Sequence, residues 1–176
     1  MADQTTPPRP ISAPHLSAIA IVSLVLAVQK KEIASDDNKL KVTTSGFWVK
    51  RSDLNKEAAL QAAYKSKEMY VMVISDAKST VGNMTLEQHH QTTCDRMLQK
   101  MNKSSATAPT SHTIDGHPAW QDEVSGTQQR TNLVFLHTTV DDGNNFQQIL
   151  AWTTKSRWPQ ENAELRAVTN SFHAEK

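Results

Sequence analysis

The chain has few cysteines, few glycines and almost no net charge: one Cys and five Gly among 176 residues, with 19 Lys and Arg against 18 Asp and Glu. One cysteine excludes an internal disulfide and a zinc site made of cysteines alone. The balanced charge provides no broad positive field for a polyanion, so nucleic acid is not the partner we expect. Length and composition suit a single globular domain.

The scarcity of glycine also weighs against common catalytic loops. The sequence contains neither a phosphate-binding glycine loop nor a Gly-x-Ser-x-Gly nucleophile motif. Adjacent carboxylates such as Asp122 and Glu123 point to opposite faces of a strand, so they cannot easily share a substrate. We therefore assign no catalytic or cofactor-binding residue and expect a protein that is not an enzyme.

The amino-terminal part differs in composition from the rest. Residues 1–15 hold four of the seven prolines, which predicts a disordered lead. Leu16–Val28 is apolar except for two serines, and it is short for a membrane-spanning helix. It fits a secretory signal or an uncleaved anchor, although the lysines that follow it oppose the usual charge bias. A buried helix of the domain is the alternative, and residues 29–39 read as a charged linker.

Residues 40–176 alternate between strand and helix patterns. We expect strands at Leu40–Thr43 and Phe47–Lys50, and a strand covered on both faces at Met69–Ile74. Thr85 and Gln88 form a capping box that begins a helix whose apolar face includes His90, Cys94 and Met97. The polar residues 102–113 read as a loop.

Three strands follow, at about His117–Val124, Thr131–Val140 and Phe146–Thr154, and their short connections predict an antiparallel meander. Asp141–Asn145 reads as a hairpin turn rather than a calcium loop, with Gly143 supplying a positive φ. Pro159 begins a final helix. The pattern predicts an α+β fold with two main helices packed against a mostly antiparallel β-sheet.

Several motifs of this half resemble the PsbP-like family. They are Gly116-His-Pro-Ala-Trp120, Gln148-Ile-Leu-Ala-Trp152 and Thr169-Asn-Ser-Phe172, preceded by Gly46-Phe-Trp48 and Met84-Thr-Leu-Glu87 in the family's order. The resemblance covers about residues 40–173. It implies an α/β/α sandwich, and it makes Ala59–Tyr64 a strand although propensity alone would place a helix at Asp53–Tyr64.

The resemblance also implies a setting. Bacterial relatives often carry an amino-terminal signal, anchor or lipidation site, which agrees with Leu16–Val28, but the lipid-accepting cysteine is missing here. We expect an accessory or protein-interaction domain of the cell envelope, outside the cytoplasm, that contacts the membrane through this segment. A cytosolic partner-binding or effector-chaperone-like protein of the same fold is the alternative.

The candidate site residues are few. His90 and Cys94 lie four residues apart on a helix and could share a zinc ion, which would suit a metal-assisted enzyme, but two ligands do not make a site. We therefore assign no metal and no cofactor. Single histidines such as His112, His117 and His137 are expected to be structural or solvated. Trp152, Arg157 and Trp158 are candidate partner-binding residues, unless the tryptophans belong to the core.

Overall fold

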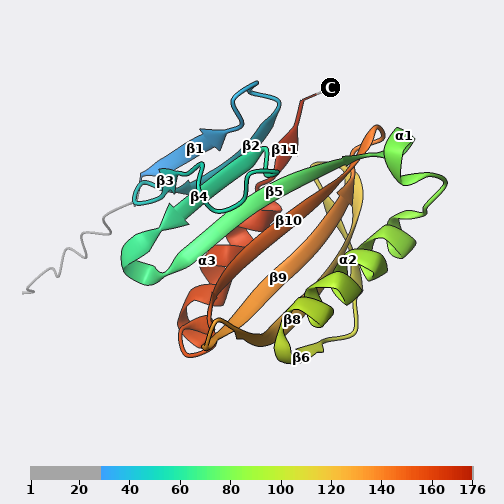
Figure 1. The fold of residues 1–176 in the computed structure, drawn as a ribbon. Helices are drawn as coiled ribbons and strands as arrows, with labels where there is room; N and C mark the ends of the chain where they lie inside the picture. Colours follow the sequence, from blue (N-terminus) through green and yellow to red (C-terminus); the bar gives the residue numbers. More distant parts are fainter. Residues whose placement is uncertain (1–28, 176) are drawn as a thin grey trace, which may run out of the picture.

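The computed structural model describes residues 29–175, which form two antiparallel sheets and three α-helices (Figure 1). The strands are β1 (Lys30–Ala34), β2 (Leu40–Ser45), β3 (Val49–Lys50), β4 (Leu60–Tyr64), β5 (Met69–Ala77), β6 (Asn102–Ala106), β7 (Thr110–Ile114), β8 (His117–Gln128), β9 (Thr131–Asp141), β10 (Asn145–Thr154) and β11 (His173–Ala174). The helices are α1 (Lys78–Val81), α2 (Leu86–Lys100) and α3 (Trp158–Asn170). The predicted lead at 1–15 and the apolar run at 16–28 lie outside the described residues.

The main sheet has the order β3-β4-β5-β10-β9-β8-β6, and β7 also pairs with β8. A smaller sheet has the order β1-β2-β11. The meander β8-β9-β10 is continuous in sequence, as its short connections predict, and β9 lies inside the sheet between β8 and β10. The α+β class and the mostly antiparallel sheet are confirmed.

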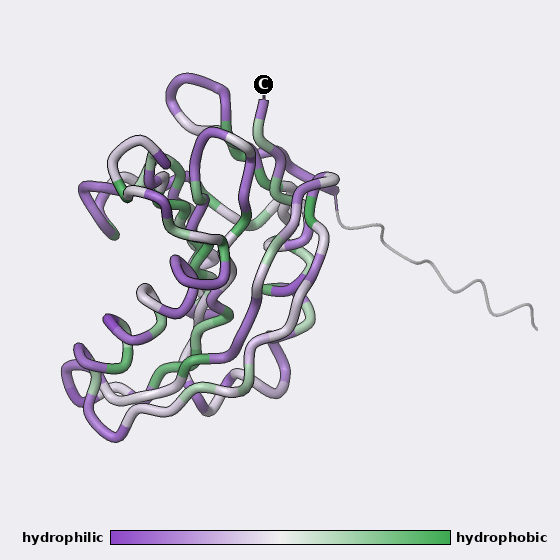
Figure 2. Tube along the Cα trace, turned by 90° about the vertical axis from the view of Figure 1, so that its right-hand side faces the viewer, coloured by the Kyte–Doolittle hydropathy of each residue, from purple (hydrophilic) through white to green (hydrophobic). Residues whose placement is uncertain are grey.

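Alternation along β10 shows how the helices are divided between the two faces. Ile149 and Ala151 belong to the larger core, which also contains Leu165 and Val168 of α3. Leu150 belongs to a smaller core with Cys94 of α2. Because successive strand residues point to opposite faces, α3 and α2 cover opposite faces of the main sheet. Figure 2 shows apolar segments gathered between these layers and hydrophilic ones at turns and outer helix surfaces.

The two long helices begin where local sequence signals place them. The Thr85 side chain accepts a hydrogen bond from the Gln88 backbone N–H, and the Gln88 side chain accepts one from the Thr85 N–H, so the predicted capping box is present. Pro159 lies in the first turn of α3, where its missing N–H leaves no helix bond unmade. α2 therefore has a fixed start, which sets where its buried face meets the sheet.

Two segments predicted to be irregular are strands. The linker interpretation of residues 29–39 is wrong for Lys30–Ala34, which is β1 and pairs with β2 over five residues. The loop interpretation of residues 102–113 is also wrong, because β6 and β7 both pair with β8. These are polar edge strands with few buried side chains, so the alternation of apolar residues that identifies strands was absent.

The structure also decides two other expectations about strands. Leu60–Tyr64 is β4, paired with β5, so the strand implied by the family resemblance is confirmed over the helix indicated by propensity. Met69–Ile74 lies in β5, but burial alternates along it. The expectation that this strand is covered on both faces is therefore wrong. Among the described residues no helix is long and apolar enough to cross a membrane.

Gly126 of β8 faces the end of α2 at close range. A Cβ at this position would lie 2.8 Å from the Cβ of Met101 and 3.1 Å from its Sδ. We expect Gly126→Ala to lower the free energy of unfolding by about 1–3 kcal/mol through overpacking, measured by urea denaturation. Gly46→Ala is the control, because its nearest neighbour, the Gln29 carbonyl, is 3.4 Å away. Equal losses for both variants would contradict the packing argument.

Candidate functional site

Helix α2 covers only part of its face of the main sheet. It packs on β6, β8 and β9, whereas β5 and β10 lie beside it (Figure 1). The register places Met72 of β5, Leu150 of β10 and His137 of β9 in one row across this face, and Tyr70, Trp152 and Phe135 in the next. In each row the β9 residue lies nearest to α2, and the β5 residue lies farthest from this helix.

Met72, Leu150, Phe135 and Trp152 from these rows form the floor of a groove. Tyr70 lines the adjoining depression, together with Leu54 and Trp152. The rings of Tyr70 and Trp152 stack with centroids 5.2 Å apart, and Trp152 stacks on Phe135 at 5.5 Å. Tyr70, Met72 and Trp152 are only partly buried. Three strands thus present a continuous aromatic row that residues 29–175 leave partly open to solvent.

Two walls enclose about 440 Å³ above this floor. One wall is α2, which contributes Arg96, Met97 and Lys100. The other is the segment between β3 and β4, which includes Leu54, Asn55 and Glu57. Gln61 of β4 fixes that segment: its Oε1 accepts hydrogen bonds from the backbone N–H groups of residues 54 and 55, at 2.8 and 3.1 Å. The second wall is therefore anchored to the sheet.

Some of the charged side chains around the groove have partners, and others have none among the described residues. Arg96 and Lys100 are exposed, one helical turn apart, and neither forms an ion pair within residues 29–175. Glu57 stands on the opposite wall and is also exposed. Asp76, at one end, instead has two partners: His89 Nε2 lies 3.0 Å from its carboxylate and Gln148 donates a hydrogen bond to it. The wall formed by α2 thus offers two free cations to a ligand.

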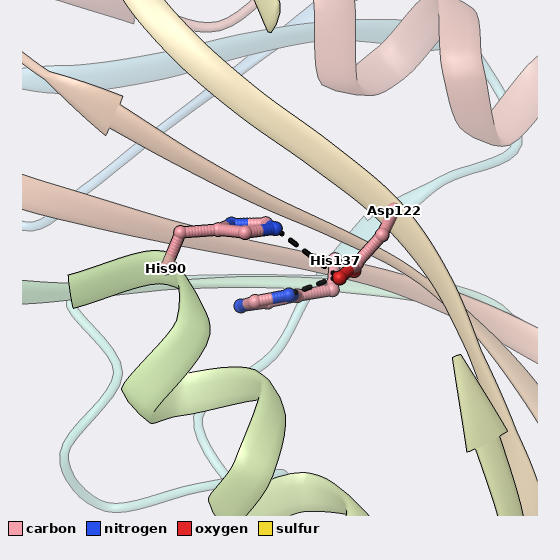
Figure 3. Close-up of side chains that lie close together, drawn as sticks. All are labelled: His90, Asp122 and His137. Atoms are coloured by element: carbon pink, nitrogen blue, oxygen red, sulfur yellow. Dashed lines mark hydrogen bonds and ion pairs between the residues drawn. The ribbon is translucent and has the colours of Figure 1, made fainter. Parts of the chain in front are cut away.

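A polar cluster lies beneath α2, next to the groove. Figure 3 shows His90 of α2, His137 of β9 and Asp122 of β8 with their polar atoms together. His137 Nδ1 lies 2.9 Å from Asp122 Oδ1, and His90 Nε2 lies 3.2 Å from Oδ2, although its alignment falls short of a hydrogen bond. The two imidazoles stack at 4.3 Å with an angle of 16° between their planes. All three residues are buried.

Two threonine hydroxyls complete the cluster. Thr139 Oγ1 lies 3.0 Å from His90 Nδ1, and Thr93 Oγ1 lies 2.9 Å from His137 Nε2. Burial lowers the pKa of His137 and favours its neutral form, against the opposing effect of Asp122. A neutral His137 donates its Nδ1–H to the carboxylate and accepts from Thr93 at Nε2. Burial would raise the pKa of Asp122, but the hydrogen bond from His137 and the nearby imidazole of His90 hold it well below its usual range.

The cluster tests the zinc alternative. His90, Asp122 and His137 bring three ligand atoms within 4.8 Å of one another. A zinc ion bonded to both imidazoles would lie near both ring planes, about 2.0–2.1 Å from each nitrogen. Stacked planes at 16° do not meet at that distance, so the two rings do not fit one shared ion. The geometry instead suits two imidazoles held by one carboxylate.

Cys94 does not complete a metal site either. It lies in the small apolar core with Val124 and Phe135. Burial, with a contribution from Asp122, raises the pKa of its thiol to about 12. At pH 8 about one thiol in ten thousand is therefore ionised. The position is that of a small apolar side chain, and the zinc pair of His90 and Cys94 gains no support from its surroundings.

A thiol reaction tests the burial of Cys94. We expect Ellman's reagent at pH 8 to leave the native chain unmodified for hours and to modify one thiol per chain in urea, because the reactive species is the exposed thiolate. The urea sample is the internal control, since Cys94 is the only cysteine. Modification of the native chain at the rate of free cysteine would contradict this assignment.

Asp122, His137 and Thr93 also repeat the order of an acid, base and hydroxyl relay. Thr93 lies in the middle of α2, where backbone N–H groups bond to carbonyls four residues back. A nucleophile at this position has no free N–H donors beside it to stabilise an oxyanion. Its hydroxyl also lies 2.9 Å from the carbonyl of His90. The hydrogen bonds between these three residues thus hold α2 against the sheet. The other groups that an acyl-transfer site needs are not found beside Thr93.

The three predicted partner-binding residues are not brought together. Trp152 lies in the groove floor. Trp158 packs against the larger core on the other side of the sheet. Arg157 forms an ion pair with Glu68 at 2.6 Å. The expected group of Trp152, Arg157 and Trp158 is therefore not a single surface.

Comparisons with solved structures identify the fold. The chain is similar to cyanobacterial PsbP from Synechocystis (TM-score 0.63, 11% identity, covering 90% of this chain and 100% of that one). It is similar to LpqN of Mycobacterium tuberculosis, described as involved in cell envelope biogenesis (0.61, 12%, 84% and 91%), and to the Saccharomyces cerevisiae Ran-binding protein Mog1p (0.56, 11%, 84% and 96%). No family model and no curated protein matches the sequence. The resemblance to the PsbP-like fold is confirmed.

Proposed function

We propose that this PsbP-like chain is a non-enzymatic accessory domain of the cell envelope that binds a partner protein in the groove between α2 and β5. The partly open aromatic row of Tyr70, Trp152 and Phe135 is the observation that carries the proposal. Aromatic side chains in a desolvated depression are typical anchors of protein interfaces. Mog1p, which has a similar fold, is named for binding a protein partner.

The groove also indicates the chemistry of the partner. Both floor strands are internal to the sheet, β5 between β4 and β10 and β10 between β5 and β9, so no strand edge is free for a partner strand. Two strands span about 10 Å, the width of one α-helix. The free cations Arg96 and Lys100 favour carboxylates along one side of the partner. The partner segment we propose is an amphipathic helix with an acidic flank.

Site-specific photocrosslinking in the native cells tests this proposal. A photoreactive residue at Met72 is expected to give a defined protein adduct, whereas one at exposed Gln160 on α3 is not. Arg96→Glu with Lys100→Glu is expected to reduce the adduct at least about fivefold, because two attractions become repulsions. Both side chains are exposed, so folding should be unaffected. No adduct at Met72, or one that charge reversal leaves unchanged, would overturn the proposal.

The envelope location is a separate part of the proposal. It is supported by the apolar run Leu16–Val28 and by the fold shared with LpqN. An alkaline phosphatase fused after Lys176 is expected to be active, because that enzyme works only outside the cytoplasm. The cytosolic alternative, which the lysines after the run favour, predicts an inactive fusion.

A further inference from the structure

The two most exposed large apolar side chains of residues 29–175 lie two residues apart, near the point where the described chain begins. Phe47 is 63% and Val49 56% exposed, against 38% for the next, Met84. Phe47 stacks on Tyr64 with ring centroids 5.4 Å apart. Residues 29–175 leave Phe47 largely uncovered, whereas Tyr64 is partly buried and the neighbouring Trp48 is fully buried. We call Phe47, Val49 and Tyr64, with the three lysines described next, the amino-terminal patch.

Three lysines lie near these apolar residues, through the chain or through strand pairing. Lys31 donates a hydrogen bond from Nζ to the Trp48 carbonyl at 3.2 Å, which places its ammonium group beside the Trp48–Val49 peptide. Lys30 pairs with Ser45 in the small sheet, and Lys65 directly follows Tyr64. None of the three lysines forms an ion pair with a described residue. The patch therefore combines exposed apolar groups with cations that form no ion pair with a described residue.

The patch lies at the attachment point of the apolar run. Gln29 follows Val28 directly, and its carbonyl oxygen lies beside Gly46, which precedes Phe47. One residue spans at most about 3.6 Å. The headgroup layer of a bilayer is about 5–8 Å thick on each side of the hydrocarbon. A domain held by Leu16–Val28 in a membrane would thus have this patch within the headgroup layer.

We propose that the amino-terminal patch lies on an anionic bilayer, with Phe47 and Val49 in the interface and Lys30, Lys31 and Lys65 against lipid phosphates. The inference rests on the membrane tether of the proposed function and adds the orientation of the domain. Aromatic residues favour the membrane interface, and lysines near it are attracted by anionic lipids. The groove, on the face of the sheet covered by α2, is left free for its partner.

Fluorescence quenching on the full chain tests this orientation. Phe47→Cys and Asn144→Cys are labelled with the dye NBD, and native Cys94 is buried. Asn144 is a matched control, because it lies beyond the Ala77 end of β5, whereas Tyr64 pairs at the Met69 end. The chains are reconstituted in phosphatidylcholine vesicles with phosphatidylglycerol and a headgroup-proximal spin-labelled lipid.

The dye at position 47 is expected to shift to the blue and to be quenched at least about threefold more than the dye at 144. Lys30→Glu with Lys31→Glu, or omission of phosphatidylglycerol, should reduce that quenching by about half. A chain that floats with the vesicles but is not quenched at position 47 would overturn the patch and leave the tether standing. A chain that does not float would overturn both. Shielding of position 47 without vesicles that grows with protein concentration would assign the patch to a protein contact instead.

Discussion

Replacing Asp122 by alanine is expected to lower the free energy of unfolding by about 1.5–3 kcal/mol, the usual cost of losing a buried hydrogen bond to a charged group. The carboxylate faces both His137 Nδ1 and His90 Nε2, and its side chain is only 3% exposed. Its loss leaves the buried Nδ1–H of His137 without an acceptor. The urea midpoint at pH 7.5, with an unchanged slope, measures this loss.

Glu123→Ala is the matched control for Asp122→Ala. Glu123 is the next residue on β8, but it points to the opposite face, where it pairs with Arg166. Both members of that pair are about one-third exposed, so its loss should cost no more than about 1 kcal/mol. Similar losses for both variants would show that the cluster under α2 contributes nothing special.

The cluster was not predicted from the sequence because one turn was misplaced. The first strand of the meander was expected to end at about Val124, whereas β8 continues to Gln128, which pairs with Thr131. The real turn is Gln129 and Arg130, both with positive φ. Tight hairpin turns of this kind usually carry Asn or Gly, so the sequence gives no signal here. A turn placed at 129–130 would have paired Asp122 with His137.

The groove was missed for a different reason. Apolar residues such as Met72 and Leu150 were correctly assigned to strands, and Trp152 was singled out. Strand periodicity reveals which face a residue points to, but not which helix covers that face. How much of the sheet face α2 leaves uncovered depends on where the helix packs over β8 and β9. The capping box at Thr85 determines where the helix starts, but not this position. The fold was therefore predictable from local patterns and the family resemblance, while the site required the packing.

Acid is expected to destabilise the domain well above the range in which carboxylates titrate. Burial lowers the pKa of both His89 and His137 below the ordinary value of 6.5. Below pH 6.5 the unfolded chain therefore binds protons that the folded chain does not, and the free energy of unfolding falls as the pH falls. Each imidazole contributes at most about 1.4 kcal/mol per pH unit. We expect a total loss of about 1–3 kcal/mol between pH 7.5 and 5.5, measured by urea denaturation.

His89→Gln separates the two imidazoles. His89 stacks on Phe146 at 4.5 Å, and its Nδ1 is buried without a partner, so protonation there would create an unpaired N–H. Glutamine can still reach Asp76 but does not titrate, so this variant should lose about half of the pH dependence between 7.5 and 5.5. His112→Gln, at an exposed position, should retain all of it. An equal free energy of unfolding at pH 7.5 and pH 5.5 would contradict this explanation. It would mean that the folded chain binds protons as readily as the unfolded chain, so the packing of α2 would not depend on neutral histidines.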